Sequence, residues 1–121
     1  MIKSYKDLIV WQRAMELVTE IYRISKSFPK EEIFGLTSQI RRAAVSVPSN
    51  IAEGHGRMTG GEYLQALGHA RGSLMEVETQ MAIAMNLSFL RLDQTKTAAG
   101  KIDETGRMLN TLIASVQRRS K

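Results

Sequence analysis

The sequence predicts an all-α protein, an antiparallel up-down-up-down four-helix bundle. Apolar residues recur at intervals of three and four along most of the 121 residues, and this is the spacing of one helix face. No segment alternates apolar and polar residues in the way a half-buried strand does. Four helical segments joined by short links are most simply packed as a bundle of antiparallel neighbours.

The first predicted helix begins near Ser4, because Ser4 and Asp7 have the spacing of a capping box. It carries two apolar seams that lie side by side. One seam consists of Leu8, Trp11, Met15, Val18 and Tyr22, and the other of Val10, Ala14, Leu17, Ile21, Ile24 and Phe28. This apolar face is wider than a surface helix needs. The helix should therefore have partners on two sides, which is a first sign of self-association.

The second predicted helix follows a break at Phe28-Pro29, since a residue before proline avoids the helical conformation. Residues 30–32 (Lys-Glu-Glu) should open it, with carboxylates near the positive end of the helix dipole. Its apolar spacing continues in phase past Pro48 to Ile51. This continuity predicts a kink at Pro48 and not a break.

The third predicted helix begins after a glycine-rich turn, where Thr59 and Glu62 again have capping-box spacing. Within it, Gly68 and Gly72 favour close approach of another helix. A short connection at residues 86–90 leads to a fourth helix, which runs from about Asp93 into the basic tail. No linker divides the chain, so we expect a single domain over residues 1–121.

The composition excludes several classes of protein. There is no cysteine, and this excludes disulfides, thiolate metal sites and a cysteine nucleophile. No stretch approaches the roughly 20 apolar residues that span a bilayer, and the first residues lack the apolar run of a signal peptide. We therefore expect a cytoplasmic protein with no membrane contact.

The basic excess is concentrated at the two ends of the sequence. The chain has 17 Lys and Arg against 12 Asp and Glu, a net charge of +5. Residues 1–30 have a net charge of +3 and residues 91–121 of +4, whereas residues 61–90 have −2. The tail Arg118-Arg119-Ser120-Lys121 is the densest cluster. It is either a solvated terminus that complements the helix dipole or a phosphate-contacting tail.

Two polar stripes run beside the apolar faces of the second and third predicted helices. The first consists of Gln39, Arg42, Ser46, Asn50, Glu53 and Arg57, and the second of Glu62, Gln65, His69, Ser73, Glu76 and Gln80. If the stripes face each other, their buried polar groups have to satisfy one another. We interpret six of these residues as a structural polar network or subunit interface: Gln39, Ser46, Asn50, Glu53, Ser73 and Glu76.

A catalytic or metal site built from Glu53, Glu76 and His69 is the competing interpretation. Di-iron sites in helix bundles use a Glu with a His three residues later, and no Glu of this sequence has that partner. The glycines precede no Gly-Lys-Ser/Thr phosphate loop. We therefore expect no catalytic residue, no metal and no cofactor, and we expect loss of Glu53 or Asn50 to lower thermal stability or disrupt assembly.

Five blocks of the sequence resemble one bacterial family. They are Asp7–Gln12, Phe28–Glu32, Gly35–Ala44, Val45–Gly54 and Gly72–Glu76. On these blocks the chain resembles the 23S rRNA intervening-sequence proteins, to which the accessory variability determinant of diversity-generating retroelements is related. The resemblance implies an antiparallel four-helix bundle in a ring-shaped homopentamer with no established enzymatic activity. The retroelement relative further suggests binding to nucleic acid and to a reverse transcriptase.

Our leading hypothesis is a non-enzymatic homopentameric scaffold that binds RNA or DNA through backbone phosphates. The expected contact residues are Arg41, Arg42, Arg57, Arg118, Arg119 and Lys121. In the alternative interpretation of the Arg41-Arg42 pair, one arginine anchors an inter-helix salt bridge and the other is solvated. Two other functions stay open: a protein–protein interaction module with no nucleic-acid role, and a small-ligand or catalytic site on the polar stripes.

Overall fold

A computed structural model describes residues 2–119, and this part of the chain is all-helical. It contains the 3₁₀ turns η1 (Tyr5–Asp7) and η2 (Lys30–Glu32) and the helices α1 (Ile9–Ser25), α2 (Leu36–His55), α3 (Gly60–Asn86) and α4 (Leu92–Arg119). No strand occurs within residues 2–119. The predicted fold class is therefore confirmed as an all-helical protein with four helices. None of the described helices combines the length and apolar character needed to cross a bilayer.

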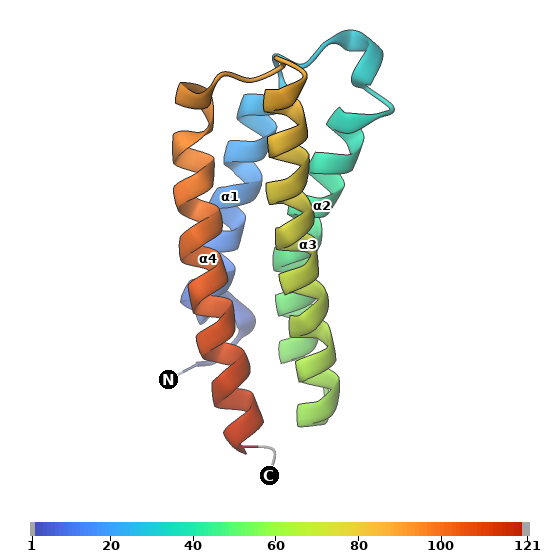
Figure 1. Cartoon of the computed structure of the whole chain (residues 1–121). Helices are drawn as coiled ribbons and strands as arrows, with labels where there is room; N and C mark the ends of the chain where they lie inside the picture. The colour runs from blue at the N-terminus through green and yellow to red at the C-terminus, as the bar shows by residue number, and fades with distance from the viewer. Residues whose placement is uncertain (1, 120–121) are drawn as a thin grey trace.

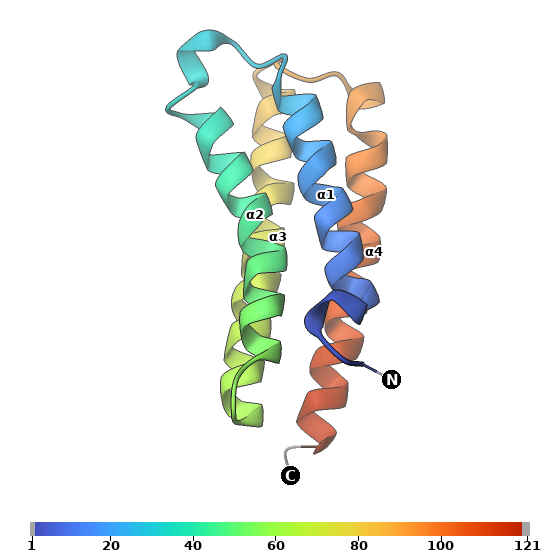
Figure 2. The same ribbon diagram turned by 180° about the vertical axis from the view of Figure 1, so that it is seen from behind.

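The four helices lie side by side around one core (Figures 1 and 2). The α1–α2 and α3–α4 connections lie at one end of the molecule, and the α2–α3 turn lies at the other. α1 and α3 each pack against α2 and α4, and the most extensive of these contacts joins α2 to α3. The α2–α3 pair therefore forms the best-connected half of the molecule.

Only one of the two apolar seams of α1 is fully buried in the core, and the other packs against the edge of the core through Leu8, Trp11 and Val18. The seam from Val10 to Phe28 is buried throughout, and it packs with buried apolar residues of α2, α3 and α4. In the other seam, Met15 and Tyr22 remain 42% and 41% exposed. A single copy of the chain thus leaves much of the second seam uncovered.

The first helix begins later than predicted. The capping box is present: the Ser4 hydroxyl accepts the Lys6 N–H at 3.1 Å, and the Asp7 carboxylate accepts the Ser4 N–H at 3.2 Å. It caps only η1, however, because Leu8 has an extended backbone (φ −73°, ψ 123°) that separates this turn from α1. The capping signal was real, but it marks a short 3₁₀ turn.

The prediction that residues 30–32 open the second helix was also wrong. These residues form η2, and Gly35, with φ −113° and ψ −117°, separates them from α2. The Glu32 carboxylate accepts the Leu36 N–H at 3.0 Å, so it caps α2 from outside the helix. Beyond this start, α2 continues unbroken through Pro48 as far as His55.

The starts of α3 and α4 agree with the sequence. Thr59 Oγ1 accepts the Glu62 N–H at 3.1 Å and caps α3, and α4 begins at Leu92, one residue before the predicted position. At the end of α2, the buried Gly54 faces α3. A Cβ atom on Gly54 would lie 2.8 Å from the Ala66 Cβ and 2.9 Å from the Tyr63 Cδ1. Glycine therefore permits the close approach of α2 to α3.

We expect Gly54→Ala to lower the free energy of unfolding by about 1–3 kcal/mol, because the added methyl overpacks the α2–α3 contact. Urea unfolding measures this change. The control is Gly100→Ala, since Gly100 is exposed on α4 and a Cβ there meets nothing within 4 Å. That variant should gain up to about 1 kcal/mol from helix propensity. Equal stability of both variants would contradict the close approach at Gly54.

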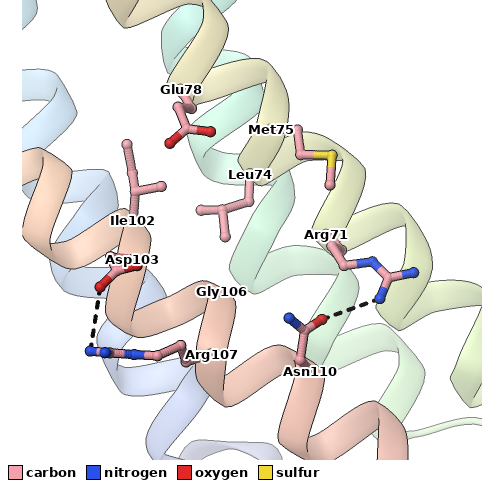
Figure 3. A pocket seen from close by; sticks show the side chains of 9 residues that line it. All are labelled: Arg71, Leu74, Met75, Glu78, Ile102, Asp103, Gly106, Arg107 and Asn110. Carbon is pink, nitrogen blue, oxygen red and sulfur yellow. Dashed lines mark hydrogen bonds and ion pairs between the residues drawn. The ribbon is translucent and has the colours of Figure 1, made fainter.

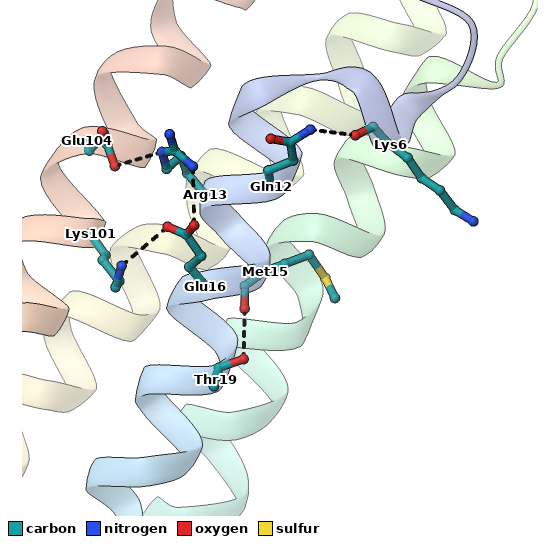
Figure 4. A network of polar contacts seen from close by, with 8 residues as sticks. All are labelled: Lys6, Gln12, Arg13, Met15, Glu16, Thr19, Lys101 and Glu104. Atoms are coloured by element: carbon teal, nitrogen blue, oxygen red, sulfur yellow. Dashed lines mark hydrogen bonds and ion pairs between the residues drawn. The ribbon is translucent and has the colours of Figure 1, made fainter.

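A chain of charged side chains joins α1 to α4 (Figure 4). Arg13 lies between two carboxylates, 3.2 Å from Glu16 and 3.4 Å from Glu104, and Lys101 lies 3.3 Å from Glu16. One turn further along α1, the buried Glu20 accepts a hydrogen bond from Arg23 Nε at 2.8 Å. The acidic residues of α1 therefore face α4 and their own helix.

Stability should depend on pH through Glu20. The hydrogen bonds from Arg23 lower the pKa of Glu20 below its ordinary value of 4.5, and they outweigh burial, which raises it. The unfolded chain then takes up the proton first, so this stabilisation is complete above that value and is lost as pH falls through the folded pKa. Urea unfolding from about pH 7 to about pH 3 should show the advantage of wild type over Glu20→Gln shrinking in acid. A pH-independent difference would contradict this.

Candidate functional site

The two predicted polar stripes meet along a groove between α2 and α3. One part of the groove is lined by Gln39, Arg42, Ala43, Ser46, Ser73, Glu76 and Gln80, and the other by Ser46, Asn50, Gly68, His69, Gly72, Ser73 and Glu76. Because the two parts share Ser46, Ser73 and Glu76, they form one continuous groove. We call it the α2–α3 groove.

A hydrogen-bonded group at the centre of this groove connects the two helices. The Ser46 hydroxyl accepts a hydrogen bond from Ser73 Oγ at 2.8 Å and one from Asn50 Nδ2 at 2.9 Å. Asn50 Nδ2 also donates to the Ser46 carbonyl at 2.8 Å. Ser73 is buried, so its hydroxyl depends on this bond. Three of the six predicted network residues are thus bonded to one another.

The other three predicted network residues have different positions. Gln39 and Glu76 line the groove. Glu53 does not line either part of it; its carboxylate is exposed and lies 2.7 Å from Arg57. The buried Gln80 Oε1, by contrast, has no hydrogen-bond partner within the described residues. Glu53 was included in the stripe because the helical spacing shows only which residues share a helix face. It does not show which side chains form hydrogen bonds or ion pairs.

The groove does not unite the three residues considered for catalysis. It contains His69 and Glu76, while Glu53 pairs with Arg57 outside it. Within residues 2–119, no group of three or more His, Asp or Glu side chains is placed to hold a metal ion. The central serine and asparagine side chains are bonded to each other.

We expect Asn50→Ala to lower the free energy of unfolding by about 1 kcal/mol relative to Asn110→Ala, because only Asn50 bonds to the half-buried centre of the groove. Asn110 accepts one exposed bond from Arg71 at 3.2 Å, and the pair of variants cancels the helix propensity of alanine. Glu53→Ala should cost no more than about 0.5 kcal/mol, since it removes an exposed ion pair. Urea unfolding of the three variants is the measurement, and the reverse order would contradict a network centred on Ser46.

The cations predicted to contact phosphate do not form one patch. Arg42 lies in the first half of α2 and Arg57 just beyond its end, about 22 Å apart at 1.5 Å of rise per residue. Arg118 and Arg119 are exposed at the end of α4. Lys121 lies outside the described residues. The predicted set therefore divides between the first half of α2 and the end of the bundle that holds the α2–α3 turn (Figure 1).

Arg41 holds α2 against α1. Its Nε donates to Ser25 Oγ at 2.8 Å, and its guanidinium carbon lies 4.7 Å from the centre of the Tyr22 ring. This is the predicted inter-helix anchor, although it is a hydrogen bond and a cation–π contact and not a salt bridge. Its neighbour Arg42 is exposed at the edge of the α2–α3 groove.

The end of the bundle near the α2–α3 turn is basic. Arg57 lies 2.7 Å from Glu53 and 3.8 Å from Glu62, so two carboxylates already balance its charge. Burial raises the pKa of Tyr63, and the nearby charge of Arg119 partly lowers it. Neither Arg118 nor Arg119 forms an ion pair with a carboxylate of residues 2–119. These two arginines are the more available cations of this end.

A second hollow, which the sequence did not indicate, lies between α3 and α4 (Figure 3). Leu74 and Ile102 line it, and a Cβ atom on Gly106 would reach the Leu74 Cδ2 at 3.4 Å. Its polar side chains are paired: Arg71 donates to Asn110 at 3.2 Å, and Arg107 lies 3.5 Å from Asp103. Arg107 is thus balanced by a carboxylate, whereas Arg71 has a neutral hydrogen-bond partner.

Residues 6–111 match the sequence model of the 23S rRNA-intervening sequence proteins. The chain belongs to this family. The matched segment contains both walls of the α2–α3 groove, and it ends before Arg118 and Arg119. The family assignment therefore extends to the groove but not to the basic end of α4.

The fold is also similar to a crystal structure of a protein with unknown function from the S23 ribosomal protein family of Bacteroides thetaiotaomicron VPI-5482. The TM-score is 0.79, and the match covers 86% of this chain and 97% of that chain at 19% sequence identity. At this identity the likeness establishes the fold alone. None of the curated proteins matches the chain.

Proposed function

We propose that the chain is a subunit of a non-enzymatic homopentameric ring that binds RNA or DNA through backbone phosphates. The single observation that carries the nucleic-acid part is the basic end of the bundle, where Arg118 and Arg119 are exposed and unmatched by carboxylates of the described residues. Free guanidinium groups bind phosphate strongly, and each contact releases counterions from the nucleic acid. Five copies at +5 would carry a charge of about +25.

Apart from the exposed Phe34, the large aromatic side chains contact other residues of the chain, which favours contact with the nucleic-acid backbone over stacking on bases. Trp11 packs edge-on against Tyr5, and the Arg41 guanidinium covers the Tyr22 ring. Proteins that bind single strands by stacking have several aromatic side chains whose ring faces are open to successive bases. We propose RNA as the first ligand to test, since the description of the family names 23S rRNA.

The ring is a proposal that rests on the family resemblance and on uncovered apolar surface. Met15, Tyr22 and Val45 are each about 40% exposed on adjacent faces of α1 and α2. We propose five as the number of subunits in the ring. We also propose that α2 is kinked at Pro48 and that a reverse transcriptase is a further binding partner. Five copies of the 13.5 kDa chain would have a mass of about 67 kDa.

The phosphate proposal predicts salt-dependent affinity that depends on the end of α4. Binding of a labelled RNA and a labelled duplex DNA should weaken steeply from about 20 mM to about 300 mM salt. Arg118→Ala/Arg119→Ala should weaken binding roughly tenfold at low salt and reduce the slope of log K against log salt by about 2. Fluorescence anisotropy measures both quantities.

The matched control is Arg91→Ala/Arg107→Ala. It removes the same charge from two arginines that have aspartate partners, Asp93 at 3.1 Å and Asp103 at 3.5 Å. This variant should keep most of the affinity. No affinity at low salt, or affinity that ignores salt, would refute the proposal, and an equal loss in the control would refute the assignment to the end of α4.

A protein-interaction module is the second candidate, and one observation favours it. Phe34 is 95% exposed in the connection between α1 and α2, next to the half-exposed Ile33. Large apolar side chains at a loop tip are unfavourable in water and suit a protein partner. If the wild-type chain binds neither RNA nor DNA at any salt concentration tested, a protein-interaction module becomes the favoured function.

A further inference from the structure

The outward side of α3 has no charged residue along most of its length. The exposed positions Gly61, Gln65, Gly68, Gly72, Met75, Thr79 and Ala82 follow one another at alternating steps of four and three. We call these seven residues the α3 strip. It extends over about 32 Å. The outward face of a surface helix normally carries its charged residues, whereas this spacing is that of a seam packed against another helix.

Two glycines of the α3 strip have no role in packing within the chain. A Cβ atom on Gly68 or Gly72 would meet nothing within 4 Å. Each glycine inside a helix costs about 1 kcal/mol relative to alanine. Gly54 has a neighbour that explains it, but Gly68 and Gly72 do not. Their open backbone suits the close approach of a helix from outside the chain.

A second uncharged surface lies on a different side of the bundle. It is an apolar groove between α1 and α2, lined by Tyr5, Trp11, Met15, Val18, Val45, Pro48, Ser49 and Ala52. We call it the α1–α2 groove. Met15 and Val45 are 42% and 40% exposed there. The groove contains most of the α1 seam that the core leaves uncovered.

The charges beside these two surfaces are of opposite sign. Lys6 follows the groove residue Tyr5, and Arg41 lies one helical turn before Val45, so both cations lie next to the α1–α2 groove. The carboxylate of Glu53, beside Ala52, is paired with Arg57. The acidic residues of α1 face α4 instead. Glu62, Glu76 and Glu78 lie beside the α3 strip together with one cation, Arg71, so residues 61–90 have a net charge of −2. The borders of the two surfaces thus carry net charges of opposite sign, which favours their contact.

We propose that the α3 strip of one copy packs into the α1–α2 groove of a second copy. The occupant of the groove is then a glycine-bearing helix, and the acidic border of that helix faces the cations beside the groove. Such a contact joins two different surfaces, so every added copy presents a free strip and a free groove until a ring closes. This inference rests on the proposed ring and specifies the surfaces that form its interface.

The test is the double variant Gly68→Gln/Gly72→Gln, examined by size-exclusion chromatography with light scattering. Within one subunit the added side chains enter open space, so helicity should be kept and intrinsic helix stability should rise. Between subunits they block the close approach, so the mass should fall from that of the oligomer towards 13.5 kDa. The control is Gly100→Gln, at an exposed α4 glycine that also has open space around it, and it should keep the wild-type mass.

A mixing experiment tests the pairing of two different surfaces. Val45→Glu should also be monomeric, because it places a carboxylate in the apolar α1–α2 groove. Each variant keeps one intact surface, so an equimolar mixture should form a heterodimer of about 27 kDa, twice the mass of the chain. An interface made of the same surface on both copies would give no such complex, and that result would overturn the inference.

The outcomes separate this inference from the ring itself. A wild-type chain that stays at 13.5 kDa at high concentration would refute the proposed ring, and the interface with it. A wild-type oligomer whose mass is unchanged in Gly68→Gln/Gly72→Gln would refute the interface and leave the ring standing. A decrease in mass in Gly100→Gln as well would also count against the α3 strip.

Discussion

A helix in a four-helix bundle turns only one face to the core, and both α1 and α3 carry two uncharged seams. One seam of each helix is buried, and it defines the bundle. The second seam of α1 lines the α1–α2 groove, and that of α3 is the α3 strip. Uncovered apolar area is unfavourable in water in proportion to its size. The proposed ring and its proposed interface both depend on this excess of uncharged surface.

The charges follow from the same constraint. The acidic residues of α1 lie on neither of its seams: Glu16 pairs with Lys101 of α4 and with Arg13, and Glu20 pairs with Arg23 of its own helix. On α2, Arg41 packs against Tyr22 and Ser25, and just beyond the end of α2 the charge of Arg57 is balanced by two glutamates. The end of α4 retains arginines without such partners. The positions of the arginines without carboxylate partners therefore say more about where an anion could bind than the net charge of +5 does.

Much of the fold could be predicted from the sequence, because helix periodicity and caps are local. The buried seam of α1 and the cap at Thr59 are where the spacing placed them. The starts of α1 and α2 were missed, since single backbone conformations at Leu8 and Gly35 decide them. In the candidate site, Ser46 and Ser73 were found by their spacing. Glu53 follows the same spacing but lies outside the groove, because it pairs with Arg57 just beyond the end of α2.

The sequence by itself determined the helical class, the polar stripes and the presence of more apolar seams than one core can bury. These properties repeat with the helical period and need no knowledge of neighbouring helices. Only the tertiary structure decided which seam is buried, that Ser46 bonds to Ser73, and which arginines are left unpaired. Each of these depends on how every helix is rotated about its own axis, and the packing of all four helices together sets that rotation.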